Sequence, residues 1–341
     1  MKRRIVLFCC LILLAQFTAE RSLAWAEETR SPQTIAVAAE IGRISKAARG
    51  TVGVAAVHLE TGQRISSHAG ESFPMASTVK VAVAVNILDL VDKGRINLTS
   101  HIPVERSEPA PEGPLGDTKW RPGLSFPVSV LLESMIIKSD NTATDVLYRL
   151  AGGPAAVHAY LQSMGLKDIY PARYIRELLR DVLSIPAPAS STTSLVDQFR
   201  RMSPQQASER RAKAYRANPS YDADPRDQAT PSAMLELLCK IWREDGVSGP
   251  ARSMLLSMME RCTTGSKRIR GRLPAGTVVA DKTGTLAGTV NDVGFITLPD
   301  GKGHIAIVVL IKGSEATSDT RETVIADIAR LLYDYFLISA P

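Results

Sequence analysis

The chain has 341 residues and a formal net charge of +6, with 45% hydrophobic and 22% charged residues. This length corresponds to one large or two smaller domains. The charge falls to +3 when the leader described below is removed, which is too small to indicate a nucleic-acid or membrane-surface partner. The histidines do not show the spacing of metal ligands, which disfavours a zinc hydrolase and leaves no metal or cofactor predicted. The five are His58, His68, His101, His158 and His304.

The amino-terminal segment has the pattern of a secretory leader. Lys2–Arg4 precedes an apolar run over residues 5–17, and Ala24–Ala26 has the small-x-small form of a signal-peptidase site. The run is shorter than the ~20 residues of a membrane span, and Cys9 and Cys10 lie inside it, which argues against a membrane anchor and against a lipoprotein. We predict a signal peptide over residues 1–26 and a secreted or periplasmic mature protein. Cleavage removes four cationic side chains and one carboxylate, so the net charge falls to +3.

After the leader, the sequence predicts strands at both ends of the chain and helices between them. Ser31 as an N-cap with proline next to it opens a helix to about residue 48, and a strand over 52–59 turns at Thr61-Gly62 into a partner from Arg64. Apolar residues at helical spacing predict helices over 77–91, 127–138, 142–151, 154–164, 231–244 and 249–261. Strands return at 278–282, 291–298 and 304–311, and an amphipathic helix over 321–336 closes the chain.

This order of elements predicts an α/β (α+β) fold with one antiparallel sheet built from both chain ends and flanked by the terminal helices. The sheet domain would comprise residues 27–70 together with 266–341. An all-helical domain over residues 71–265 would be inserted in the middle.

Three short motifs stand in one order: Ser77-Thr-Val-Lys80, Ser139-Asp-Asn141 and Lys282-Thr-Gly284. A serine is a poor nucleophile until a base takes its proton, and Lys80, one helical turn on, can reach Ser77. Together the motifs supply a nucleophile, two amines, a second hydroxyl and an amide. Each motif alone occurs by chance in many chains, but all three in order are a strong indication of an acyl-transfer site without histidine.

The ordered motifs resemble those of the class A β-lactamase and penicillin-binding protein superfamily. The resemblance extends to the segments around them, which are 73–80, 152–154, 224–231 and 263–285. It implies a cleft between the sheet and the helical part, and hydrolysis of a lactam amide through an acyl-enzyme. The implied partner is a small-molecule β-lactam or a cell-wall D-Ala-D-Ala peptide, bound by a monomer.

The resemblance also implies a role for each motif residue. Ser77 would attack, Lys80 would act as base, and Ser139 would relay a proton to the leaving nitrogen. Lys80 needs a neutral amine for this, and burial and the neighbouring Lys282 would both lower its pKa. The amides of Ser77 and Thr285 would form the oxyanion hole. The substrate would be held by Asn141, Lys282, Thr283, Gly284 and Thr285.

Arg268 lies where some family members carry an arginine that reaches under the Lys-Thr-Gly strand towards the substrate carboxylate. A guanidinium fork suits a carboxylate. The other interpretation is a solvated basic face, because Lys267, Arg270 and Arg272 are close in sequence.

The pattern breaks at the glutamate that holds the water for deacylation. The family's spacing places it at Ile175, and Glu177 lies two residues on. If this segment is a loop, a local shift would bring Glu177 into place, so we list it as the predicted base. Losing general-base assistance costs ~10²–10⁴ in rate. The alternatives are therefore a D-alanyl-D-alanine peptidase or a penicillin-binding protein that deacylates slowly.

Two further features have open interpretations. Counted against the family pattern, residues 181–223 are a surplus that includes a basic helix from Ser203 to about residue 216, either a solvated excursion or a flap beside the cleft. Cys239 and Cys262 either form a disulfide in an oxidising compartment or remain two buried thiols.

Overall fold

The computed structural model describes residues 31–116, 121–188, 190 and 192–339. The predicted signal peptide lies outside these residues. Within them, no helix combines the length and the apolar character that crossing a membrane requires.

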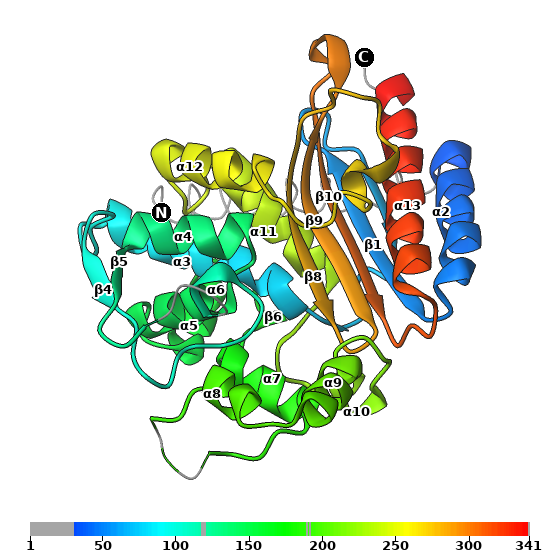
Figure 1. The fold of residues 1–341 in the computed structure, drawn as a ribbon. Coiled ribbons are helices and arrows are strands. Elements are labelled where there is room, and N and C mark those ends of the chain that lie inside the picture. The colour runs from blue at the N-terminus through cyan, green and yellow to red at the C-terminus, as the bar shows by residue number, and fades with distance from the viewer. Residues whose placement is uncertain (1–30, 117–120, 189, 191, 340–341) are drawn as a thin grey trace, which may run out of the picture.

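The centre of the fold is a five-stranded antiparallel sheet in the order β2-β1-β10-β9-β8 (Figure 1). Its strands come from both ends of the chain, as predicted. They are β1 (Thr51–His58), β2 (Arg64–Ser67), β8 (Val279–Leu286), β9 (Thr289–Thr297) and β10 (His304–Lys312). Strand β8 lies at the edge, so alternate backbone groups on its outer side are not used by the sheet.

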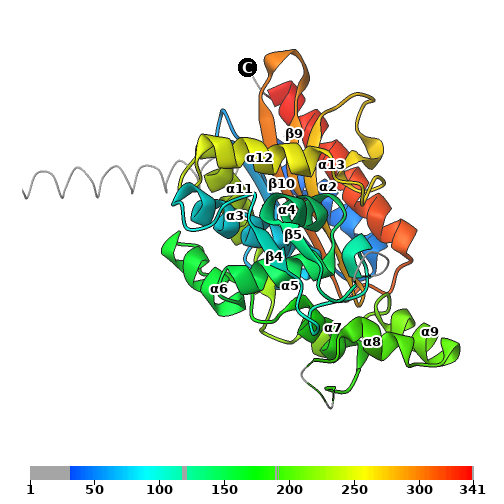
Figure 2. The ribbon, with the colours of Figure 1, turned by 60° about the vertical axis from the view of Figure 1, so that its left-hand side comes forward.

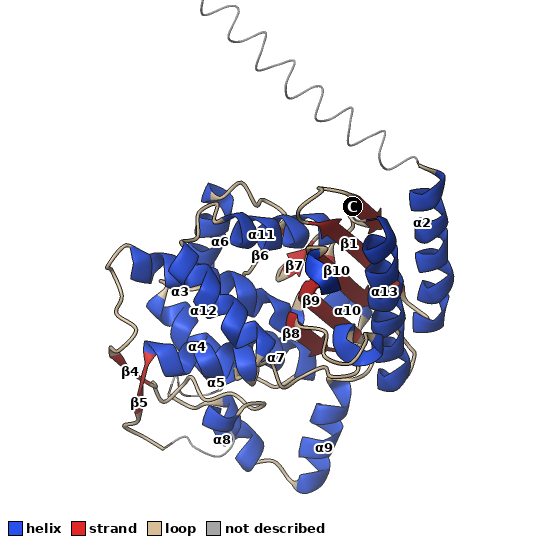
Figure 3. Cartoon of the chain, turned by 90° about the horizontal axis from the view of Figure 1, so that it is seen from above, coloured by secondary structure: helices blue, strands red, loops and turns tan. Residues whose placement is uncertain are grey.

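Each face of the sheet has its own apolar core, because successive strand residues point to opposite faces. Val54 and Ala56 of β1 pack under α2 (Pro32–Ser45) and α13 (Ser318–Ser339). Ala55 and Val57 belong to the core shared with the helical region. Seen from above, α2 and α13 lie on one side of the sheet, opposite the large group of helices from the middle of the chain (Figure 3).

The helical region lies on the other face of the sheet, where α11 contacts β1 and β10, and α12 contacts β8. Its helices are α3 (Val79–Asp92), α4 (Val128–Ile137), α5 (Asn141–Leu150), α6 (Pro154–Ser163), α11 (Pro231–Arg243) and α12 (Gly249–Glu260). All six match predicted helical segments. Short strands join the connections: β3 (Phe73–Pro74), β6 (Ile169–Tyr170) and β7 (Gln228–Ala229) form one sheet, and β4 (His101–Pro103) and β5 (Ser125–Pro127) another.

The surplus segment forms a helical layer beside the sheet edge, with α9 reaching furthest from the rest in Figure 2. It contains α8 (Leu195–Arg200), α9 (Pro204–Lys213) and α10 (Pro219–Asp222). The expected helix from Ser203 is present, opened by a capping box between Ser203 and Gln206. The preceding α7 (Ile175–Leu183) is a helix, whereas a role of Glu177 as base required a loop here.

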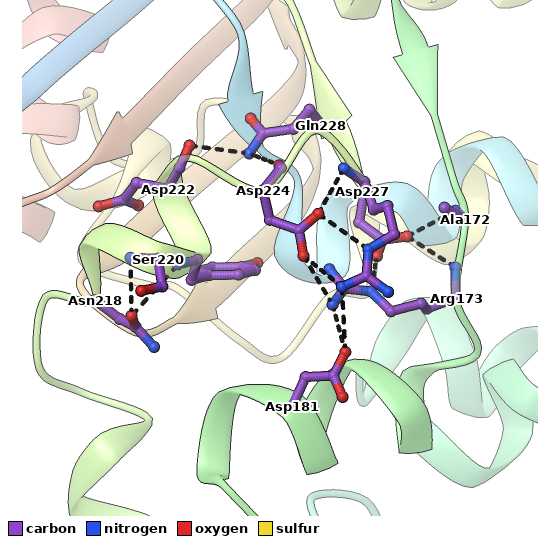
Figure 4. A network of polar contacts seen from close by, with 11 residues as sticks. Ala172, Arg173, Asp181, Asn218, Ser220, Asp222, Asp224, Asp227 and Gln228 are labelled. Atoms are coloured by element: carbon purple, nitrogen blue, oxygen red, sulfur yellow. Dashed lines mark hydrogen bonds and ion pairs between the residues drawn. The ribbon is translucent and has the colours of Figure 1, made fainter.

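An ion-pair cluster fixes the entry and exit of this segment (Figure 4). The buried Arg173 donates to Asp227 at 2.6 Å and to Asp181 at 2.7 Å, and lies 3.1 Å from Asp224. Asp227 also accepts from the backbone N–H groups of Ala172 and Arg173. One guanidinium thus holds the start of α7 against the strand that leads back into the helical region.

Cys239 and Cys262, the cysteines in the described part of the chain, are free thiols; Cys239 is buried in α11, and Cys262 is partly buried after α12. The structure therefore favours two thiols over a disulfide. The Cys262 sulfur lies 3.2 Å from the hydroxyl of Thr264.

Candidate active site

Ser77 lies in a 3₁₀ turn, Ala76–Thr78, directly before α3, and its side chain is partly exposed. The turn is fixed to the sheet by Asn291 of β9, whose amide donates to the carbonyl oxygens of Pro74 and Met75 at 2.8 and 3.0 Å. Ala76 has a φ of +46°, a strained value for a residue with a side chain. The backbone therefore presents Ser77 rigidly at the edge of β8.

Gly284 permits that close approach. A Cβ on Gly284 would come within 2.8 Å of the Met75 carbonyl oxygen and 3.1 Å of the Ser77 nitrogen. Real Cβ atoms essentially never come as close as the first of these distances. The third motif thus needs glycine because its backbone packs against the turn that carries Ser77.

Ser139 joins the two amines of the site. Its hydroxyl lies 3.1 Å from Nζ of Lys80 and 3.0 Å from Nζ of Lys282. Ser139 has a φ of +55°, and the next residue, Asp140, caps α5 by accepting from the Ala143 N–H. The strained residue and the cap together aim the hydroxyl between the two amines.

Lys80 is fully buried and donates to the Ser139 carbonyl oxygen at 2.6 Å and to Oδ1 of Asn141 at 2.7 Å. The structure shows no hydrogen bond between Lys80 and Ser77, so the expected direct contact is not made in this state. Ser77 Oγ has no hydrogen-bond partner within the described residues. Lys80 reaches the second motif, and Ser139 is the group that it shares with Lys282.

Burial is the main cause of the lowered pKa values of the two lysines. It lowers the pKa of Lys80 well below its usual value, and the Lys282 cation lowers it further, against smaller opposing effects of Asp140, Glu112 and Asp145. Burial also lowers the pKa of Lys282, to about 8. A neutral Lys80 can accept a proton while Lys282 remains charged below about pH 8.

Arg268 is buried beneath the third motif. Its guanidinium donates to the carbonyl oxygens of Gly284 and Asn291 and to the Thr285 hydroxyl at 2.7 Å, while Nε donates to Glu322 at 3.1 Å. The solvated-face alternative is therefore wrong for this residue. The hydroxyl oxygen of Thr283 lies 2.6 Å from the hydroxyl oxygen of Thr264.

These groups surround a cavity of about 370 Å³ that opens at Ser77. It is lined by Ser77, Glu112, Gly113, Lys138, Ser139, Tyr215, Thr264, Arg268, Thr283, Thr285 and Ser318. Five of these lie outside the motifs and matching segments of the sequence: Glu112 and Gly113 from the loop between β4 and β5, Lys138, Tyr215 from the surplus segment, and Ser318. No local motif marks them, because the fold alone brings their loops to the cavity.

A second, smaller cavity at Ser77 has α7 as its wall. Ile175, Leu178 and Leu179 line it together with Asn141 and Glu112. The carboxylate of Asp145 fixes the start of α7 by accepting from the Ile175 N–H at 2.6 Å and from Arg176. Burial raises the pKa of Asp145 to about 6, against the opposing effect of Arg176.

Glu177 does not line either cavity at Ser77. At 100° per residue it lies about 200° around α7 from Ile175, whereas Leu178 and Leu179 return to the same face. Its carboxylate accepts from the Tyr174 N–H at 3.0 Å and caps the helix. The local shift that would serve in a loop is therefore not the observed arrangement, and the role of Glu177 as base stays a prediction.

Among the described residues, no group of three His, Cys, Asp or Glu side chains is placed to hold a metal ion. The reactive groups of the site are a hydroxyl, two amines and a guanidinium. This combination can accept a carboxylate-bearing acyl donor and transfer its acyl group to Ser77.

The model of the β-lactamase enzyme family matches residues 36–336. Extended-spectrum β-lactamase PER-1 of Pseudomonas aeruginosa is 30% identical over 297 residues, covering 85% of this chain and 83% of the relative. The carbapenem-hydrolysing β-lactamase KPC of Klebsiella oxytoca is 27% identical over 96% of this chain and 95% of its own length. A crystal structure of a β-lactamase from Chitinophaga pinensis superimposes with a TM-score of 0.71 at 31% identity, covering 87% of this chain and 98% of that one. The expected fold class is thereby confirmed.

Proposed function

Because this chain belongs to the β-lactamase enzyme family, we propose that it is an exported class A-type serine hydrolase that opens β-lactams through an acyl-enzyme on Ser77. The observation that carries the proposal is the Ser139 hydroxyl, which bridges Lys80 and Lys282 at the cavity that contains Ser77. The substrate is a small β-lactam, and the protein acts as a monomer without nucleic acid.

In the acylation step, neutral Lys80 takes the Ser77 proton, directly after a small movement or through Ser139. The Ser77 oxygen bonds to the lactam carbonyl carbon, and the carbonyl oxygen becomes an oxyanion held by the backbone amides of Ser77 and Thr285. When the C–N bond breaks, Ser139 gives its proton to the ring nitrogen and regains one from Lys80. Lys282, Thr283, Thr285 and the underlying Arg268 hold the substrate carboxylate, and Asn141 holds the acylamino group.

Deacylation needs a carboxylate to activate water, and two residues are candidates. Glu177 is the candidate from sequence, but its carboxylate caps α7. Glu112 is the only acidic side chain among the described residues that line the two cavities at Ser77. Its carbonyl accepts from the Asn141 N–H at 3.2 Å, and the neighbouring Pro111 carbonyl accepts from the Asn141 side chain at 2.9 Å. This anchoring keeps Glu112 beside the nucleophile, and we assign it the water-activating role.

The second candidate function is a D-alanyl-D-alanine peptidase or a penicillin-binding protein that deacylates slowly. The apolar wall of Ile175, Leu178 and Leu179 beside Ser77 favours it, because that wall offers no base to a water molecule.

Mixing the mature protein with a chromogenic cephalosporin, and following colour and intact mass together, separates these functions. Colour development that continues beyond one equivalent of cephalosporin supports the hydrolase. A stoichiometric burst with a lasting adduct supports the slow acceptor. Ser77→Ala should form no adduct, whereas Ser232→Ala, an exposed serine on α11, should behave as the unchanged protein. An adduct that persists in Ser77→Ala would overturn both functions.

A further inference from the structure

The surplus segment lines a third cavity, next to the larger of the two cavities at Ser77. Its volume is about 430 Å³, and it is lined by Pro111, Glu112, Leu179, Leu183, Phe199, Arg211, Ala214 and Tyr215. Glu112 and Tyr215 also line the larger cavity at Ser77, so these two cavities share a wall. The two cavities are therefore adjacent at Glu112 and Tyr215.

The walls of this cavity are held in place from several directions. The Ala214 carbonyl accepts from the Ala287 N–H at 2.6 Å, directly after β8, and the Tyr215 carbonyl accepts from Arg321 of α13. At the other side, Arg210 of α9 donates to the Leu183 carbonyl oxygen at 3.2 Å. The segment is thus fastened to the sheet and to α7 at these points, while α9 itself has no buried residue.

The lining combines apolar side chains with the guanidinium of Arg211, the carboxylate of Glu112 and the hydroxyl of Tyr215. Leu179, Leu183, Phe199 and Ala214 are buried. The Arg211 guanidinium lies 5.6 Å over the Phe199 ring and makes no ion pair or hydrogen bond within the described part of the chain. The one carboxylate on the wall, Glu112, already interacts electrostatically with Lys80. An aromatic body with an anionic group would satisfy both the walls and Arg211.

We propose that this cavity is a substrate subsite, built by the surplus segment, that binds the acyl side chain of a β-lactam when that side chain carries an aromatic or aliphatic group and a carboxylate. The inference rests on the proposed acylation of Ser77. Arg211 is a specificity-determining residue that contacts the side chain and takes no part in the bond changes.

Two penicillins with the same ring system test the subsite: one with a phenylacetyl side chain, and one in which the same side chain bears an α-carboxylate. The readout is the ratio of their acylation rate constants, measured from the Ser77 adduct by intact mass, so deacylation does not enter. Arg211→Ala should lower the ratio of carboxylated to neutral substrate about fivefold, the upper range for an exposed ion pair. Arg211→Lys should retain part of it.

Arg216→Ala is the matched control, because Arg216 is exposed, lies outside the lining and removes the same charge. It should leave the ratio unchanged, and added salt should lower the ratio in the unchanged protein but not in Arg211→Ala. Adducts that form with an unaltered ratio in Arg211→Ala would overturn the subsite while the proposed function stands. Failure of both penicillins to form an adduct would overturn the two together.

Discussion

The two cavities at Ser77 have walls that differ in kind. One wall is polar: Ser139 lies within 3.1 Å of both Lys80 and Lys282, and Arg268 supports the strand behind them. The other wall, α7, presents Ile175, Leu178 and Leu179. The polar wall carries the groups needed to form an acyl-enzyme, and the apolar wall lies where the family would place a base for water. Acylation and deacylation can thus change independently within one fold.

The polar wall is tested most severely at Lys80. Lys80→Met should lower the rate of adduct formation by ~10²–10⁴, because the base is lost while the side-chain volume is nearly kept. The measurement is the rate of mass gain with a β-lactam in excess. Lys93→Met, which removes an exposed lysine at the end of α3, is the control and should acylate normally. Normal acylation by Lys80→Met would remove Lys80 from the mechanism.

Because the apolar wall carries no carboxylate, Glu112 is the residue expected to support turnover. If the protein turns over, Glu112→Gln should slow deacylation by ~10²–10⁴ and let the adduct accumulate, because the amide cannot accept a proton from water. Rapid mixing followed by intact mass separates adduct formation from adduct loss. Equal loss rates in Glu112→Gln and the unchanged protein would exclude Glu112 as the base.

The position of the apolar wall depends on Arg173. Arg173→Met should cost about 3–5 kcal/mol of unfolding free energy, because it leaves carboxylates such as the buried Asp227 without their cation. Denaturant unfolding measures the cost. Arg226→Met is the control, because Arg226 is exposed and pairs mainly with Asp224. A loss in Arg173→Met no larger than in this control would show that the cluster does not hold α7.

The sequence predicts the parts of the molecule that depend on local patterns, but not those that depend on contacts between distant residues. The sheet and the six helices of the helical region follow from periodicity, and the ordered motifs predict that Lys282 lies near Lys80. The Ser139 bridge between the two amines does not follow, because the sequence predicts a direct contact of Lys80 with Ser77 instead. Glu112 and Tyr215 do not follow either, because their loops reach the cavity only through contacts distant in sequence, such as Ala287 with Ala214. The loop considered around Ile175 is a helix because Asp145, thirty residues earlier, satisfies its first N–H groups.

The pH dependence tests the electrostatics of the polar wall. Burial lowers the pKa of Lys282 to about 8, so its charge is present below that pH and is lost above it. The kcat/KM for a β-lactam with a free ring carboxylate should therefore fall about tenfold per unit well above pH 8. The methyl ester of the same lactam has no carboxylate for Lys282 to bind and should lack this alkaline fall. A fall of equal size with the ester would assign it to another group.

The smallest effect is expected at Glu177, and it separates a helix cap from a catalytic base. Glu177→Gln keeps a hydrogen-bond acceptor for the Tyr174 N–H but removes a negative charge from the first turn of α7. Because that charge favours the positive end of the helix, unfolding free energy should fall by about 0.3–1 kcal/mol, while the rate of adduct loss stays unchanged. Thermal unfolding and the intact-mass time course are measured on the same sample. A stalled adduct in Glu177→Gln would mean that α7 rearranges during the reaction and that the carboxylate predicted from sequence is the base.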